Sequence, residues 1–359
     1  MKTTIAVALS GGVDSFVAAY LLCRQGYSVI GLHFITGFET YSFKGLKNKS
    51  LLDQAQDRLR PISKKLEIPI KVFDFTDEFK QNVIDYFINT YQSGQTPNPC
   101  LICNPIIKFS YLAKHAYKLG AKGLATGHYA RRKQNRLGFW QLYKGIDSKK
   151  DQSYFLSRLT QDQLSFARFP LGEMTKRDTI TLAQKTGLHP IAKKESQDIC
   201  FIKKNKNYGD FLAKQPGFSF TPGPIVDVSG KVIGTHFGLH LFTIGQRRGI
   251  NCPASEPYYV VRLIPERNCL VVGFKNNLVK RGCKVAQINW INTIPSASFK
   301  AGVRLRYRHK EVLADIMPAY DSTAVVRFDI PQKAVTPGQG IVIYQDDLVI
   351  GGGWIREPF

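Results

Sequence analysis

The chain has 359 residues, of which 43% are hydrophobic and 21% charged, a composition typical of a folded globular protein. At roughly 150 residues per domain, the length predicts two or three domains with ample buried core. No apolar run approaches the roughly 18 residues of a membrane-spanning helix, which excludes an integral membrane protein of that kind. The 50 Lys and Arg against 27 Asp and Glu give a net charge of +23, spread along the chain. This charge fits either a polyanionic partner that touches more than one domain or a solvated basic surface.

The seven cysteines are an odd number, and the apolar stretch before Gly11 is too short for a secretory signal. Both observations argue against a disulfide scaffold and favour a reducing compartment. We therefore expect a cytoplasmic protein.

The first part of the chain alternates strand and helix signals, starting with a continuous apolar run typical of a buried parallel strand. Strand patterns occupy residues 5–9, 28–34, 70–75 and 123–126, and helical patterns occupy residues 14–24, 51–67, 78–90 and 104–119. This alternation predicts an α/β domain with a doubly wound parallel sheet, in which ligands bind at the carboxyl ends of the strands.

The pattern changes near residue 205 and again near residue 280. Residues 216–257 are rich in Gly, Pro, Thr and Ser, with a hairpin turn predicted at Ser229 and Gly230. Short alternating strand patterns follow and predict a small antiparallel barrel; examples are residues 284–288, 303–307, 324–328 and 340–344. We therefore expect three domains: a catalytic domain at 1–204, a small central domain at 205–279 and a C-terminal β-barrel at 280–359.

The segment Ser10-Gly11-Gly12-Val13-Asp14-Ser15 joins the first predicted strand to the first predicted helix. Its glycines let the backbone approach an anion, and the helix N-terminus and the serine hydroxyls favour phosphate there. Asp14 fits beside phosphates only if a Mg²⁺ ion bridges them, and the alternative is a tight turn with a capping aspartate. The spacing is that of neither a P-loop NTPase nor a dinucleotide fold. It resembles the loop of the PP-loop ATP pyrophosphatases, which split ATP into AMP and pyrophosphate.

A second motif, Thr96-Pro97-Asn98-Pro99-Cys100-Leu101-Ile102-Cys103-Asn104-Pro105, combines two cysteines with prolines that force an extended loop. With Asn104 as N-cap and Pro105 at the first helical position, Cys103 would lie just before a helix N-terminus, with Lys108 nearby. Both features predict a lowered thiol pKa, as in a nucleophile. Cys200 can meet Cys103 if both loops cover the same rim of the sheet, although spacing alone favours a buried small side chain at Cys200.

Further motifs occur along the chain in a fixed order after the Ser10–Ser15 loop and the Cys103 segment. They are Thr126-Gly127-His128-Tyr129-Ala130-Arg131, Lys150-Asp151-Gln152-Ser153-Tyr154, Glu195-Ser196-Gln197-Asp198-Ile199-Cys200-Phe201, Gly234-Thr235-His236 and 242–249. Together they resemble the tRNA-specific 2-thiouridylase family, called MnmA in bacteria, and the match runs from Ala8 to Gly353. The family's PP-loop domain, central domain and β-barrel agree with the three predicted domains.

The resemblance implies an enzyme that replaces O2 of the wobble uridine of tRNA, at position 34, with sulfur. ATP, with Mg²⁺, adenylates O2, and a persulfide on Cys200 then attacks C2. Cys103 matches the position called the nucleophile and either releases sulfide from the persulfide or resolves it, leaving a Cys103–Cys200 disulfide. The implied products are 2-thiouridine, AMP and pyrophosphate. The implied partners are tRNAs for Lys, Glu and Gln, and a cysteine desulfurase or persulfide relay protein as sulfur donor.

Cys100 departs from the family, because many members have an aspartate there that is a candidate general base. Cys100, Cys103 and Cys200 would instead supply three sulfur ligands. These could hold a [4Fe–4S] cluster with one open iron, or zinc with one open position. A Cys-x-x-Cys pair also serves as a redox dithiol, so we favour metal-free persulfide chemistry and keep both metal alternatives open.

The family's ligand contacts carry over onto matching positions. For ATP they are Ala8, Leu9, Ser10, Gly11, Gly12, Val13, Asp14, Ser15, Phe34 and Gly127. For tRNA they are Asn98, Pro99, Cys100, His128, Lys150, Asp151, Gln152, Arg306, Tyr307 and Gln339. Independently, the alternation over Val303–Arg308 predicts three arginines on one strand face, which suits a phosphate backbone. The wobble base must be flipped from its stack to reach the ATP.

Two other function classes remain open from the residues alone. One is a PP-loop ligase that acts on a small molecule, which needs neither the cysteine pair nor a basic barrel. The other is a tRNA-binding protein without chemistry, which the intact Ser10–Ser15 loop with both Cys103 and Cys200 disfavours.

Overall fold

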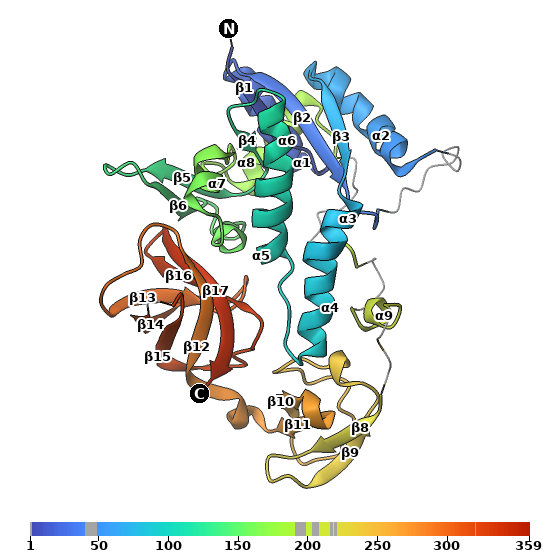
Figure 1. Cartoon of the computed structure of the whole chain (residues 1–359), viewed down its shortest axis with the longest axis vertical. Coiled ribbons are helices and arrows are strands. Elements are labelled where there is room, and N and C mark those ends of the chain that lie inside the picture. Colours follow the sequence, from blue (N-terminus) through green and yellow to red (C-terminus); the bar gives the residue numbers. More distant parts are fainter. Residues whose placement is uncertain are drawn as a thin grey trace.

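We describe a computed structural model of the chain for residues 2–39, 49–190, 199–202, 208–215, 218, 221–319 and 321–359. A parallel sheet with its helices forms the upper part of the molecule in Figure 1, a barrel lies below it, and a small central domain lies beside the barrel. No helix within these residues is both long and apolar enough to cross a membrane.

The sheet of the first domain is parallel and five-stranded, in the order β3-β2-β1-β4-β7. Its strands are β1 (Thr4–Ala8), β2 (Ser28–Ile35), β3 (Ile70–Asp74), β4 (Leu124–Ala125) and β7 (Ala167–Arg168). Alternate residues of β1 face opposite sides, so Ile5 and Val7 pack into one core cluster and Ala6 into the other. The predicted doubly wound sheet is confirmed.

Helices cover both faces of this sheet. One face carries α1 (Val13–Arg24), α2 (Leu51–Leu66) and α8 (Lys176–Thr186). The other carries α3 (Thr76–Phe79), η1 (Lys80–Ile84), α4 (Asp85–Gln92), α5 (Cys100–Cys103), η2 (Asn104–Leu112) and α6 (Ala113–Lys118). Shorter helices are η3 (Ser153–Leu156), α7 (Gln161–Phe166) and α9 (Tyr208–Leu212).

The helix after the second motif starts earlier than predicted. Its first residue is Cys100, preceded by Pro99, and Asn104 has helical dihedral angles instead of capping the N-terminus. The prediction that Cys103 lies just before the helix is therefore wrong, because Cys103 is in its first turn. Residues Asn104–Leu112 form a π-helical stretch. This stretch accommodates Pro105, which has no backbone N–H to donate, inside the helix.

The barrel is closed and antiparallel, since β12 pairs with both β15 and β17. Its strands are β12 (Val279–Trp290), β13 (Phe299–Arg304), β14 (Val312–Pro318), β15 (Ala324–Lys333), β16 (Gly340–Gln345) and β17 (Leu348–Pro358). The predicted barrel is confirmed. The hairpin β5 (Ala130–Gln134) and β6 (Trp140–Lys144) belongs to the first domain by sequence, yet β6 pairs with β17, so the barrel sheet continues into that domain (Figure 1).

The central domain is a small sheet of four strands in the order β10-β11-β8-β9. They are β8 (Gly223–Val226), β9 (Val232–His236), β10 (Tyr259–Ile264) and β11 (Cys269–Gly273). The 3-10 turns η4 (Leu239–Leu241), η5 (Pro265–Arg267) and η6 (Lys275–Leu278) connect to it. The predicted turn at Ser229 and Gly230 lies between β8 and β9, with Gly230 at a φ of +91°.

Candidate active site

The Ser10–Ser15 loop lies at the carboxyl end of β1, where it leads into α1. The Ser15 hydroxyl donates to the Gly12 carbonyl at 2.9 Å and accepts from the Ser10 amide at 3.2 Å, which closes the loop on itself. Gly11 has a φ of +82°, a conformation that favours glycine. The amides of the first α1 turn have no partner within the helix, so this end of α1 is suited to an anion.

Gly127 follows β4 and packs against the same turn. A Cβ placed on Gly127 would lie 2.8 Å from the Ser15 nitrogen and 2.9 Å from the Asp14 carbonyl carbon. Any larger residue would therefore push the loop away. The other predicted ATP residues also lie at this edge: Ala8 and Leu9 end β1, and Phe34 near the end of β2 stacks on Phe75 with ring centroids 5.6 Å apart.

Asp14 is held by two residues from other parts of the domain. Lys176, the first residue of α8, places its Nζ 2.7 Å from each carboxylate oxygen. The Tyr129 hydroxyl donates to Asp14 Oδ1 at 2.8 Å. Neither contact was foreseen from the sequence, because both partners are more than a hundred residues away and Lys176 belongs to no motif that we singled out.

The second motif brings its two cysteines onto the first turn of the helix that begins at Cys100. Both thiols are partly buried. Burial raises the pKa of the Cys103 thiol to about 11 and outweighs the positive charge of Lys108, and burial likewise raises the pKa of Cys100. The prediction of a lowered pKa at Cys103 is therefore wrong: the apolar surroundings stabilise the neutral thiol.

Cys200 lies beside this pair. Its neighbours Ile199 and Ile202 pack against the same core as Cys103, and Phe201 is anchored by rings including Phe87 at 5.1 Å and Phe211 at 5.2 Å. Burial of the sulfur raises the pKa of the Cys200 thiol, and both Cys103 and Cys100 add to the rise. The residue is nevertheless exposed, so a partner can reach it. The preceding segment Glu195–Asp198 lies outside the described residues.

Alkylation of Cys103 by iodoacetamide is expected to be slow at pH 7 and to quicken about tenfold per pH unit until the pH nears the folded pKa, because only the thiolate reacts. The rate is measured by mass spectrometry of the Cys103 peptide. In urea, where the thiol regains its ordinary pKa, alkylation at pH 7 should be far faster. Equal rates in folded and unfolded protein would contradict the raised pKa.

The three cysteines do not form a metal-ligand set. Within the residues that the structure describes, no three His, Cys, Asp or Glu side chains are placed to hold a metal ion. The three thiols act on one another's pKa, and we derive no step through a cluster or a zinc ion, which stay alternatives from the sequence.

His128 follows β4 on the segment that also carries Gly127. Thr126 Oγ1 lies 2.8 Å from its Nδ1. Burial first, and then the charge of Lys108, lower the pKa of His128 well below its usual value. The imidazole is therefore neutral at physiological pH and can serve as a hydrogen-bonding group but not as a cation.

The loop before Cys100 is joined to the barrel by hydrogen bonds. Gln339 Nε2 donates to the carbonyls of Thr96 at 3.2 Å and Pro97 at 3.0 Å, and the Thr96 amide donates to the Pro337 carbonyl at 2.9 Å. Three predicted tRNA residues, Asn98, Pro99 and Gln339, thus lie around one junction between the catalytic domain and the barrel.

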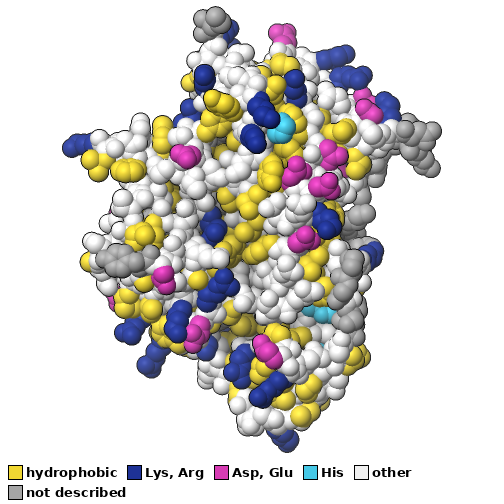
Figure 2. All heavy atoms as spheres, in the orientation of Figure 1, with side chains coloured by type: hydrophobic (Ala, Val, Ile, Leu, Met, Phe, Trp, Pro, Cys, Tyr) yellow, Lys and Arg dark blue, Asp and Glu magenta, His cyan; other side chains and the backbone are white. Residues whose placement is uncertain are grey.

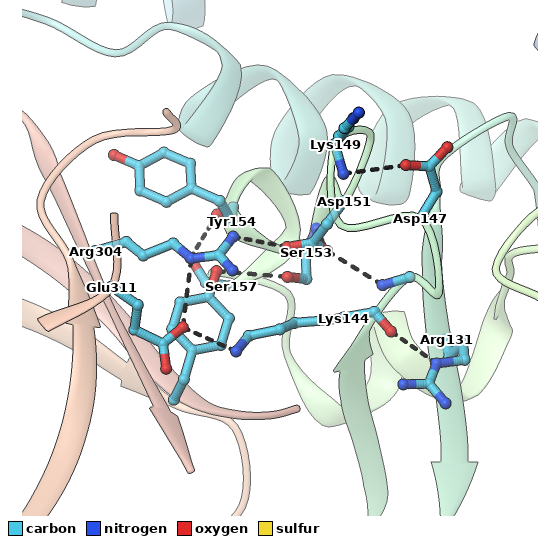
Figure 3. A network of polar contacts seen from close by, with 12 residues as sticks. Arg131, Lys144, Asp147, Lys149, Asp151, Ser153, Tyr154, Ser157, Arg304 and Glu311 are labelled. Atoms are coloured by element: carbon cyan, nitrogen blue, oxygen red, sulfur yellow. Dashed lines mark hydrogen bonds and ion pairs between the residues drawn. The ribbon is translucent and has the colours of Figure 1, made fainter. Parts of the chain in front are cut away.

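Lys150 and Gln152 are half-buried, whereas Asp151 is buried. The Asp151 side chain is 1% exposed and pairs with Arg304 of β13 at 2.8 Å, as Figure 3 shows. Arg304 in turn lies 3.4 Å from Glu311, which pairs with Lys144 of β6 at 2.8 Å. Gln152 exchanges hydrogen bonds with the Tyr129 backbone. Asp151 therefore joins the catalytic domain to the barrel, and Gln152 fixes its own loop to the backbone of Tyr129. The contact of both residues with tRNA stays a prediction.

The predicted strand with three arginines on one face is wrong. β13 ends at Arg304, which is turned toward Asp151, and residues 305–308 form a bend and turn. Arg306 is exposed, while Tyr307 packs on Phe155 with ring centroids 4.4 Å apart. Both remain candidate tRNA residues, but on a turn.

A cleft of about 620 Å³ lies where all three domains meet. It is bordered by Gln95 after α4, by Pro337 of the barrel, and by three arginines: Arg262, Arg267 and Arg356. Among the described residues none of these arginines forms an ion pair. Figure 2 shows several Lys and Arg side chains on the lower half of this face, where the barrel and central domain adjoin. Such a cleft suits a phosphodiester backbone.

Comparisons with known families cover nearly the whole chain. Residues 3–204 match the "tRNA methyl transferase HUP domain" model, residues 209–274 the "tRNA methyl transferase PRC-barrel domain" and residues 280–355 the "Aminomethyltransferase beta-barrel domain".

Curated relatives match over nearly their full length. The "tRNA-specific 2-thiouridylase MnmA" of Desulfosudis oleivorans is 48% identical over 98% of this chain and 94% of that protein. The protein of the same name from Geotalea uraniireducens is 44% identical over 99% and 96%. Among solved structures, NMN synthetase from Francisella tularensis covers 54% of this chain and 66% of that one, at 14% identity and a TM-score of 0.33, which is too low to bear on fold or function.

Proposed function

The chain belongs to the tRNA-specific 2-thiouridylase family and is a tRNA sulfurtransferase, and we propose that it thiolates the wobble uridine at position 34 by ATP-dependent adenylation and persulfide transfer. The observation that carries this mechanism is the placement of an accessible thiol, Cys200, beside the partly buried Cys103. A loop suited to phosphate lies at the carboxyl edge of the same sheet.

The first step activates a poor leaving group. The uridine O2 attacks the α-phosphorus of ATP, pyrophosphate leaves, and O2 becomes part of an AMP ester. We assign the phosphates to the loop formed by Ser10, Gly11, Gly12, Val13 and Ser15, whose serines would exchange their bonds within the loop for bonds to phosphate. Phe34 would offer an apolar face to the adenine. Mg²⁺ would neutralise phosphate charge, with Asp14 as the carboxylate in place to hold it.

The second step transfers sulfur. The terminal sulfur of a Cys200 persulfide attacks C2, so that a sulfur–C2 bond forms, the bond from C2 to the AMP oxygen breaks and AMP leaves. The transferred sulfur is at this point still bonded to Cys200 Sγ. Cys103 then gives up its thiol proton and attacks Cys200 Sγ, so that 2-thiouridine departs and takes up a proton, and a Cys103–Cys200 disulfide forms. The two cysteines lose two electrons and the sulfane sulfur gains them. An external thiol must reduce the disulfide before the next turnover. In the other order, Cys103 releases sulfide first, and sulfide attacks C2.

A thiolation assay tests this proposal. Purified protein is incubated anaerobically with ATP, Mg²⁺, a sulfide source and unmodified tRNA for Glu, and the digested RNA is examined for 2-thiouridine by mass spectrometry, with iron and zinc measured in the same sample. Thiouridine without bound metal supports the persulfide route. Thiouridine only from iron-loaded protein would overturn it and assign Cys100, Cys103 and Cys200 to a [4Fe–4S] cluster. No thiouridine, even with a desulfurase supplied, would point back to a small-molecule ligase.

We propose that tRNAs for Lys, Glu and Gln are the substrates and that a cysteine desulfurase or a persulfide relay protein loads Cys200. Exposure of Cys200 supports docking of such a donor. We also propose domain limits of 1–204, 205–279 and 280–359, supported by the family matches over 3–204, 209–274 and 280–355. A reaction that consumes ATP and turns over thiols fits the cytoplasm.

The arginine cleft leads to a salt-dependent prediction. Replacing Arg262 by alanine is expected to weaken tRNA binding several-fold and to lower the slope of log K against log salt by about 0.7 to 1, because one phosphate contact is lost. The binding constant is measured by filter binding at several salt concentrations. Arg136, exposed beyond β5, serves as the matched control. An unchanged slope for Arg262→Ala would remove the cleft from the tRNA path.

A further inference from the structure

The ion pair between Lys176 and Asp14 links the phosphate loop to a helix 162 residues further along the chain. The Lys176 side chain is 14% exposed and that of Asp14 21%, so both charges are largely removed from water. Both carboxylate oxygens lie 2.7 Å from Nζ. A pair this close and this buried makes either partner costly to remove alone.

The start of α8 is fixed independently of this ion pair. The Lys176 amide donates to Asp147 Oδ2 at 2.9 Å, and Thr175 and Asp178 form a capping box. Tyr129, which also contacts Asp14, lies 3.0 Å from the Thr179 hydroxyl on the next turn. The backbone of Lys176 is therefore anchored, while its four-carbon side chain can re-aim its charge over a few ångströms.

Asp14 is the second residue of α1, whose N-terminus is the anion site described above. A phosphate bound to the first-turn amides would lie close to the Asp14 carboxylate and to the Lys176 ammonium that touches it. Like charges there repel, so the phosphate is disfavoured by Asp14 and favoured by Lys176. Lys176 is the cation that the described structure places on Asp14.

We propose that Lys176 is a ligand of the ATP phosphates, and that without nucleotide it neutralises Asp14. This inference rests on the proposed use of ATP at the Ser10–Ser15 loop. When the triphosphate binds, the ammonium turns from the carboxylate to a phosphate oxygen, and Asp14 becomes free to take a divalent cation. One lysine thus serves the loop in both states.

A double-variant cycle tests the proposal by ATP binding, measured by calorimetry in EDTA so that neither Mg²⁺ nor catalysis contributes. Asp14→Asn alone should bind ATP more tightly than the parent, because it removes a negative charge and leaves Lys176 available. Adding Lys176→Met to Asp14→Asn should weaken binding about 10- to 100-fold, the loss expected for one charged contact to phosphate. Lys176→Arg should retain most of the affinity.

The competing explanation is that Lys176 only neutralises Asp14. In that case Asp14→Asn and Asp14→Asn/Lys176→Met would bind ATP equally, and this result would overturn the proposal. The neutral Asn and Met pair leaves no unpaired charge, so it also guards against a folding defect, which melting temperatures would check. Lys185→Met, exposed in the last turn of the same helix, is the matched control and should bind ATP like the parent.

The result separates this inference from the proposed function. ATP binding that depends on Lys176, without tRNA thiolation by the parent protein, would sustain the inference and defeat the proposed reaction. Thiolation by the parent, together with equal ATP binding by the single Asp14→Asn variant and the double variant, would sustain the proposed reaction and defeat the role of Lys176 in ATP binding.

Discussion

Replacing Cys200 by serine is expected to abolish tRNA thiolation, with a loss of at least about 1,000-fold, because the hydroxyl cannot carry a persulfide. ATP binding should persist, because the side chains that act on the Cys200 thiol are Cys103, Cys100 and Lys108, and none of them belongs to the Ser10–Ser15 loop. Cys103→Ser should also lose turnover but should accumulate persulfide on Cys200, which mass spectrometry of the intact protein detects as one added sulfur atom.

Cys252→Ser, a partly buried cysteine of the central domain, is the control and should keep full activity. Persulfide found on Cys103 in the Cys200→Ser protein would reverse the assigned roles. Full activity of Cys103→Ser would remove the resolving step and leave Cys200 as the only thiol that the reaction needs.

Replacing Arg304 by methionine is expected to destabilise the protein by about 3 to 5 kcal/mol, because it strands the buried carboxylate of Asp151 without its partner. The arginine side chain is only 16% exposed and also lies near Glu311, so the loss extends across the seam between barrel and catalytic domain. Urea unfolding measures the effect, and the proximity of Lys150 to this seam predicts weaker tRNA binding as well.

Lys300→Met provides the comparison. Lys300 is 50% exposed and pairs with Asp315 and Asp329 on the barrel surface. Exposed pairs contribute little, so this variant should change stability by less than about 1 kcal/mol. If Arg304→Met were as mild as Lys300→Met, the seam would be held by its strand pairing and not by the buried charges.

The phosphate loop was predictable because all its determinants are local. A buried strand, two glycines and a helix follow one another within residues 5–24, and the structure places them as expected. Lys176 was not predictable in the same way, because it reaches Asp14 only through the packing of α8 against α1. The sequence around Lys176 does not distinguish it from any solvent-exposed lysine at the start of a helix.

The errors at Cys103 and Arg304 have different physical causes. Asn104 and Pro105 have the sequence of a helix start, but the π-helical stretch lets the helix begin at Cys100 and carry both residues inside it. The thiol pKa then follows burial, which a sequence does not reveal. At Arg304, alternation continued past the true strand end, because the chain turns where Leu305 enters the barrel core.

The pairing of β6 with β17 also sets an order of events during synthesis. Leu142 and Tyr143 leave the ribosome about 200 residues before their partners Val349 and Leu348. Until then β6 is a strand edge with open hydrogen-bonding groups, a site where nascent chains can join one another. The edge of β6 is therefore covered only after β17 has been synthesised. In a chain truncated before β17, this edge would stay unpaired.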